Sequence, residues 1–139
     1  MKQTISLSLL LLFVMACGNN DRKNAAAEND IDAARSFIRA ALDGDYNKAQ
    51  IFMLQDSTNL EDLNTAIRLN ERLTPEEKQK YRESTIRIFQ TRALNDSSSI
   101  ITYSNSYRNR KDSLLVIKAD GKWLVDFKYI FQHKTDSLP

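Results

Sequence analysis

Apolar residues change their spacing once along this chain, near Ser84. Before that point they recur every three or four positions, which is the period of an amphipathic helix. After it, apolar and polar residues alternate, which is the period of a strand with one buried face. The pattern predicts an α+β domain in which N-terminal helices pack on an antiparallel sheet of about four strands.

Four helices are expected before Ser84. Asp30 is a candidate N-cap for the first, which carries Phe37 and Ile38 on its apolar face and stops at Gly44. Asp45 can cap the second.

Two capping-box patterns mark the remaining helices. Thr58-Asn59-Leu60-Glu61 predicts the start of the third helix, and Thr74-Pro75-Glu76-Glu77 predicts the start of the fourth. The second pattern is stronger, because Pro75 stands where its missing N–H costs nothing.

Four strands are expected at residues 85–94, 99–107, 112–119 and 122–130. Asp120-Gly121 predicts a two-residue hairpin turn, which pairs Val116 with Val125 and Leu114 with Phe127. One face of this hairpin is then the expected core face, and it carries Leu114, Val116, Trp123, Val125 and Phe127. The pattern leaves open which face of the strand at 85–94 carries Arg87 and Arg92.

The opposite face of the hairpin carries Leu115, Ile117, Leu124 and Ile130, interrupted by Asp126 and Lys128. Four large apolar side chains are more than a solvated face needs. They form a candidate interface for a homodimer or an envelope protein partner, and ordinary packing within the chain is the alternative.

The first residues resemble a bacterial lipoprotein signal. Lys2 and the apolar run Ile5–Ala16 have the parts of a secretory signal peptide. The apolar run is too short to span a bilayer. Small Ala16 then precedes Cys17, the chain's one cysteine. The resemblance implies cleavage before Cys17 and a membrane anchor through lipid on it. A lone cysteine after an ordinary signal, or in a buried N-terminal helix, is the alternative.

The chain therefore divides into a signal peptide at 1–16, a lipidated cysteine and flexible tether at 17–30, a domain at 31–133 and a polar tail at 134–139. As a coil the tether spans roughly 20 Å. Some surface-exposed lipoproteins carry an acidic run after the cysteine, but here Asp21 is followed by Arg22 and Lys23. This favours the cell envelope, on the periplasmic face of the outer membrane.

Charge and composition exclude several functional classes. The chain has 20 Lys and Arg against 18 Asp and Glu, which is too balanced for a nucleic-acid binder that neutralises phosphates. With one histidine, and no free thiol once Cys17 is lipidated, we expect neither a metal site nor a cofactor.

Two segments resemble the nuclear transport factor 2-like (NTF2-like, cystatin-like) superfamily. They are Phe37 with Ala40-Ala41-Leu42-Asp43-Gly44-Asp45-Tyr46-Asn47-Lys48-Ala49, and Asp120-Gly121-Lys122-Trp123-Leu124-Val125. The pattern is similar to small lipoprotein domains of unknown function in that superfamily. The resemblance covers residues 31–133 and implies a curved, cone-like sheet under the helices. These residues encode caps, turns and packing, so they imply little about activity.

Enzymes of that superfamily use a cone lined by an acidic or histidine base and by phenols. The candidate groups here are Tyr103, Tyr107, Tyr129, Asp126 and His133, and the candidate cavity-lining residues are Tyr103, Tyr107 and Trp123. Asp126 falls on the face opposite Trp123, and His133 follows the last strand. No base is evident on the core face, so no catalytic residue is assigned.

The sequence thus favours a non-catalytic envelope lipoprotein whose domain binds a ligand or a partner. The alternative is a small-molecule lyase or isomerase, which requires an open cone with an ionisable group beside a phenol. The identity of the ligand, the partner and the oligomeric state are not determined at this level.

Overall fold

The structure is a computed structural model that describes residues 26–133 of the chain. The predicted signal peptide, Cys17, most of the predicted tether and the tail at 134–139 lie outside these residues. Within the described range, no helix is long and apolar enough to cross a bilayer.

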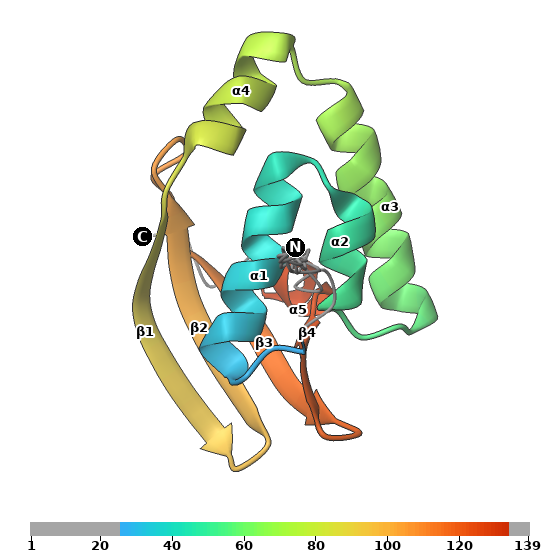
Figure 1. Cartoon of the computed structure of the whole chain (residues 1–139), viewed down its shortest axis with the longest axis vertical. Helices are drawn as coiled ribbons and strands as arrows, with labels where there is room; N and C mark the ends of the chain where they lie inside the picture. The colour runs from blue at the N-terminus through green and yellow to red at the C-terminus, as the bar shows by residue number, and fades with distance from the viewer. Residues whose placement is uncertain (1–25, 134–139) are drawn as a thin grey trace, which may run out of the picture.

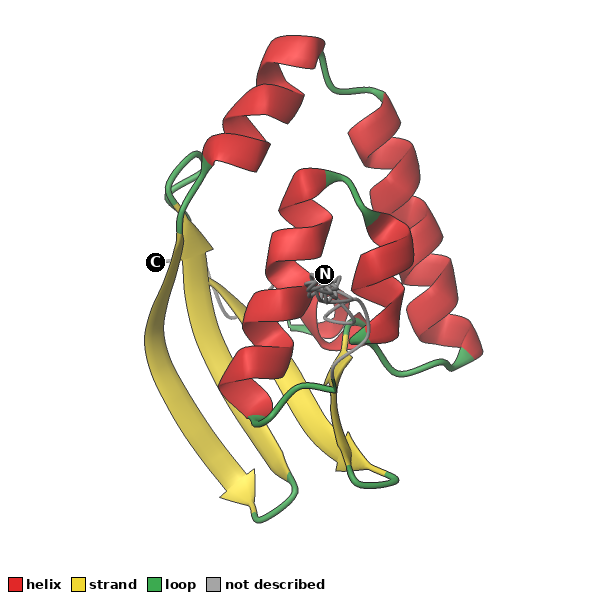
Figure 2. Ribbon diagram, viewed as in Figure 1, coloured by secondary structure: helices red, strands yellow, loops and turns green. Residues whose placement is uncertain are grey.

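Four helices precede a four-stranded antiparallel sheet, and a short helix ends the domain (Figure 1). The helices are α1 (Asp30–Asp43), α2 (Tyr46–Ile51), α3 (Ser57–Glu71), α4 (Pro75–Glu83) and α5 (Lys128–Gln132). The strands are β1 (Ile86–Asn95), β2 (Ser98–Asn105), β3 (Asp112–Ala119) and β4 (Lys122–Asp126), paired in chain order. The helices gather on one side of a curved sheet (Figure 2), which confirms the predicted α+β class.

The core lies between α1 and the inner face of the sheet, and α1 contacts all four strands. Phe37 and Ile38 of α1 are 2% and 4% exposed. The fully buried apolar residues of the strands are Ile101, Leu114, Val116 and Val125. The whole core cluster of the described residues lies between Ala27 and Ile130, so a fragment of residues 18–139 contains a complete core.

The ends of α1 are set by local hydrogen bonds. The N-cap is Asn29, whose side chain accepts from the Asp32 N–H, rather than the predicted Asp30. Asp30 instead accepts from the Ser99 hydroxyl of β2, which ties the start of the helix to the sheet. Gly44 ends the helix as predicted, with a φ of 76° that favours glycine.

The other helix starts are confirmed in two cases and wrong in one. Asp45 caps α2, and Thr74 forms a complete capping box with Glu77 at the start of α4. The predicted box at Thr58–Glu61 does not form, because Asp56 caps α3 by accepting from the Asn59 N–H. In the run Asp56-Ser57-Thr58 every residue can cap, and a contact far along the chain favours the first.

The β3–β4 hairpin has the predicted register. Val116 pairs with Val125 and Ala119 with Lys122, across a turn in which Asp120 and Gly121 both have positive φ. On β1, Arg92 pairs with Ile100 of β2, and both Arg87 and Arg92 are exposed. The register places these two arginines on the outer face, a question that the pattern left open.

The last strand is shorter than predicted. It ends at Asp126 and α5 follows, so Leu114 does not pair with Phe127. Phe127 packs on Phe37 instead, with ring centroids 5.1 Å apart. The predicted position of Ile130 on the outer face is therefore wrong, because α5 turns this residue against the core.

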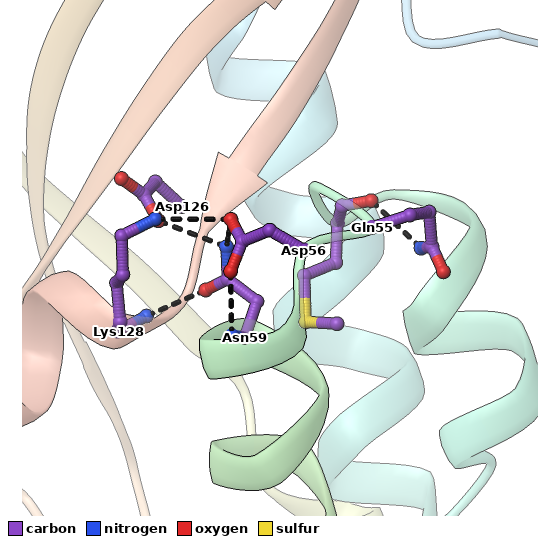
Figure 3. A network of polar contacts seen from close by, with 6 residues as sticks. Gln55, Asp56, Asn59, Asp126 and Lys128 are labelled. Atoms are coloured by element: carbon purple, nitrogen blue, oxygen red, sulfur yellow. Dashed lines mark hydrogen bonds and ion pairs between the residues drawn. The ribbon is translucent and has the colours of Figure 1, made fainter.

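A polar cluster explains both the start of α3 and the end of β4. Its members are Asp56, Asn59, Asp126 and Lys128, here called the latch (Figure 3). Asn59 is completely buried, and its Nδ2 donates to Asp56 at 2.7 Å and to Asp126 at 3.0 Å. Its Oδ1 accepts from the Lys128 backbone N–H at 2.8 Å.

The lysine closes the latch. Lys128 Nζ lies 2.7 Å from Asp126 and 3.0 Å from Asp56. The Asn59 backbone N–H, followed by Lys128, holds the pKa of Asp56 below its ordinary value. Partial burial opposes the charge on Lys128, but the hydrogen bonds that its ammonium donates to Asp126 and Asp56 raise its pKa. Asp56 and Lys128 thus each favour the charged form of the other.

Replacing Asn59 with alanine should destabilise the domain by about 3 kcal/mol, because it removes three side-chain hydrogen bonds and leaves the Lys128 backbone N–H without a partner. Urea unfolding of the 18–139 fragment measures this loss. The matched control is Asn64→Ala, at an exposed position of the same helix, which should change stability by less than about 0.5 kcal/mol. Equal stability of the two variants would show that the latch contributes nothing.

Candidate functional site

The concave face of the sheet, where the resemblance places a catalytic cone, is occupied by packed side chains. Phe37 and Ile38 of α1 are buried there, and Trp123 and Phe127 pack against the same core. Trp123 therefore contributes to the core, and Lys118 lies over its ring, 5.7 Å from the centroid.

Tyr103 lies on the inner face of the sheet. It pairs with Asp112 of β3 on one side and with Ile88 of β1 on the other, and it packs against the core. Burial of its hydroxyl, with a further contribution from Asp112, raises the pKa of Tyr103 well above its usual range. The strand pairing thus places a carboxylate beside a phenol, which the sequence pattern did not predict.

The other candidate groups lie at three separate places. Tyr107 contacts Tyr81 of α4 edge-on, with centroids 4.8 Å apart. Tyr129 stacks on His133 at the end of the domain, with centroids 4.0 Å apart. Asp126 belongs to the latch. These residues therefore occupy separate places and do not form one catalytic site.

The candidate interface on the outer face is reduced to three residues, Leu115, Ile117 and Leu124, each partly exposed. Leu124 also lines a depression with Ile51 and Met53 beside β4. Along this edge the chain adds a short parallel bridge, in which Leu54 N–H donates to Val125 O at 2.9 Å. No observation on the described residues tests the predicted interface, which stays a prediction.

A pocket lies in the helical layer, away from the concave face. It has a volume of about 520 Å³ and is bounded by the ends of α1 and α3, by α4 and by the β2–β3 loop. Its apolar lining consists of Ala41, Leu42, Ala66, Leu69 and Leu73. Its polar lining consists of Tyr46, Asn70, Arg72, Tyr81 and Arg108.

The pocket exists because α4 covers it from outside and does not pack into the core, and we call α4 the roof of the pocket. None of the side chains of α4 is fully buried, and the helix spans the distance from the end of α3 to β1 (Figure 1). Arg39 of α1 fixes the end of this roof by donating to three backbone oxygens, those of Tyr81 at 3.3 Å, Arg82 at 3.1 Å and Ser84 at 2.7 Å. The walls are thereby held apart by defined hydrogen bonds.

The polar groups of the pocket are mostly donors. Burial, and then the neighbouring Tyr81, raise the pKa of Tyr46, so its hydroxyl keeps its proton at neutral pH. Arg108 Nη1 lies 3.4 Å from the Tyr81 hydroxyl. Among the described residues, neither Arg72 nor Arg108 forms an ion pair with a carboxylate. The pocket is therefore apolar in its lining and positive in its charge.

Sequence reasoning did not identify this pocket. Tyr46 lies in the segment that carries the family resemblance, but its neighbours come from positions up to 62 residues away, at Arg108. The exposure of Leu69 at the end of α3, which leaves 54% of its surface open, became visible only in the structure.

The stability of the domain should decrease as the pH rises above about 10, the pKa of tyrosine in an unfolded chain. Because burial of its hydroxyl raises the pKa of Tyr103, the folded state holds more protons than the unfolded state above that pH, and the slope reaches about −1.4 kcal/mol per pH unit for one such group. Urea unfolding between about pH 8 and 11 should therefore show a shallower dependence for Tyr103→Phe than for the natural chain. Parallel curves would contradict the assignment.

No protein-family model matches this chain, and no curated protein matches it. One solved structure is similar, that of an NTF-2-like protein of unknown function from Shewanella oneidensis MR-1. The similarity covers 68% of this chain and 89% of the other, with 14% sequence identity and a TM-score of 0.49. The fold assignment rests on the helix placement and strand order of the chain itself. N-terminal helices on one face of a curved, four-stranded antiparallel sheet are the arrangement that the resemblance in the sequence implied.

Proposed function

We propose that this chain is a non-catalytic envelope lipoprotein whose domain binds a small, largely apolar molecule in the pocket under α4. The observation that carries the proposal is the pocket itself. Its volume of about 520 Å³ is within the range of roughly 300–1,000 Å³ that is usual for small-molecule sites. Mostly apolar walls with a few convergent polar groups are also typical of such sites.

The walls of the pocket are ordered by interactions that do not involve the ligand. Arg39 holds α4, and the capping box of Thr74 and Glu77 fixes where α4 begins. The latch fixes the opposite end of α3. A pocket whose walls are already fixed loses less free energy to ordering when a ligand binds.

The lipid anchor is part of the same proposal and is supported by the N-terminal signal pattern before Cys17. The tether would enter the domain at the start of α1, whereas the pocket lies at the other end of that helix. A helix of 14 residues is about 21 Å long. This separation would leave the pocket open to solvent when the protein is tethered to a membrane.

Filling the pocket should abolish binding. We expect the neutral fluorophore N-phenyl-1-naphthylamine to gain fluorescence with the 18–139 fragment, and Ala66→Trp to weaken its affinity at least about tenfold by occupying the apolar volume. The matched control is Asn64→Trp, which adds the same side chain to α3 outside this lining. Circular dichroism checks that both variants are folded. Equal binding by the two variants, or none by the natural fragment, would contradict the site.

The anchor has its own test in cells that make the full chain. The natural chain should sediment with membranes and resist extraction by about 1 M salt, which screens charge interactions over about 3 Å. Cys17→Ala should release it from the membrane fraction, because the thiol is the proposed attachment point. A Cys17→Ala chain that still sediments with membranes would overturn the anchor.

A further inference from the structure

We propose that the ligand of the pocket under α4 is an acidic amphiphile, a molecule with an apolar body and a carboxylate that Arg72 and Arg108 recognise. This inference rests on the proposed function, because it assigns the chemistry of a ligand for the same pocket. It follows from the donors, the charge and the exposed apolar surface of the lining.

The two arginines have unused hydrogen-bonding capacity. A guanidinium has five N–H donors. Among the described residues, Arg108 has one side-chain contact, the long one to the Tyr81 hydroxyl, and Arg72 has no hydrogen bond from its guanidinium. By contrast, Arg39 donates hydrogen bonds to Asp43 and to three backbone oxygens. Arg39 is structural, whereas Arg72 and Arg108 are available to a ligand.

The rest of the polar lining also favours an anion. Among the residues that the structure describes, no aspartate or glutamate lines the pocket, so a cationic ligand would find no opposite charge there. Tyr46 supplies a protonated hydroxyl, and Asn70 supplies an amide. Bidentate contact from arginine is the usual way in which proteins recognise carboxylates.

The apolar half of the lining defines the other end of the ligand. Leu42 and Leu73 are partly buried, and Leu69 leaves 54% of its surface exposed. An alkyl or aromatic body lying against these leucines would cover Leu69 and gain about 25 cal/mol for each Å² of apolar surface removed from water. A purely ionic ligand such as inorganic phosphate would leave this surface exposed, so the lining favours an amphiphile.

Competition among three ten-carbon probes tests the charge. Decanoate, decanol and decyltrimethylammonium share the same chain and differ in their head groups, and each would displace N-phenyl-1-naphthylamine from the 18–139 fragment at neutral pH and low salt. We expect decanoate to compete at about tenfold lower concentration than decanol, and the cation to be the weakest. Arg72→Gln/Arg108→Gln should reduce decanoate to the affinity of decanol and leave decanol unchanged. The matched control, Arg92→Gln, changes an exposed arginine on the outer face of β1 and should alter neither affinity.

The possible outcomes separate this inference from the proposed function. If the fluorophore and decanol bind but decanoate binds no better, the pocket is a ligand site and the acidic ligand is wrong. If no probe binds to the folded natural fragment, the proposed function fails as well. If the double variant does not fold, each single variant should still weaken decanoate about threefold relative to decanol, and unchanged ratios in both would overturn the inference.

Discussion

Burial of α1 against the inner face of the sheet is the interaction on which the other parts of the structure depend. Ala33 and Ala34 are fully buried, and their small side chains let the helix approach the strands closely, while Phe37 and Ile38 fill the concavity. Complete burial of one such large apolar side chain contributes about 1.5–3 kcal/mol. Because α1 contacts every strand, its position decides how the curved sheet is covered and leaves the remaining helices to pack around it.

Polar contacts then fix the positions of α3 and α4, which apolar burial by itself does not determine. At one end, the latch joins the start of α3 to the end of β4 through the buried amide of Asn59. At the other end, Arg39 holds the last turn of α4 through backbone oxygens, while its exposed ion pair with Asp43 adds little stability. Between these two polar fixtures α3 and α4 form an arch, and the space under the arch is the pocket. The pocket is thus a consequence of the polar contacts that hold α3 and α4 in place, and the core under α1 stays filled by side chains.

The location of the pocket matters for how this scaffold is understood. The concave face carries the core, and the one phenol on it with a strongly raised pKa, Tyr103, packs against that core. The pocket instead draws its groups from the helical layer and the β2–β3 loop. One fold supports many functions, so the arrangement of the helices and the sheet does not by itself indicate an activity. The argument for ligand binding comes from the lining residues.

The sequence by itself determined the features that depend on near neighbours. Residue spacing predicted the change from helices to strands, Asp45 and Thr74 marked helix starts, and Asp120-Gly121 set the register of the last hairpin, because caps, turns and periodicity act within a few residues. The tertiary structure decided the features that join distant residues. Asn59 and Lys128 are 69 positions apart in the chain and are joined by a hydrogen bond. With this contact, α3 starts earlier than its predicted cap at Thr58, and β4 ends before Ile130. The pocket has the same origin, since Leu42 and Arg108 line one site only after the helices and the sheet have packed. Contacts of this kind depend on the relative placement of whole elements, which no local pattern in the chain specifies.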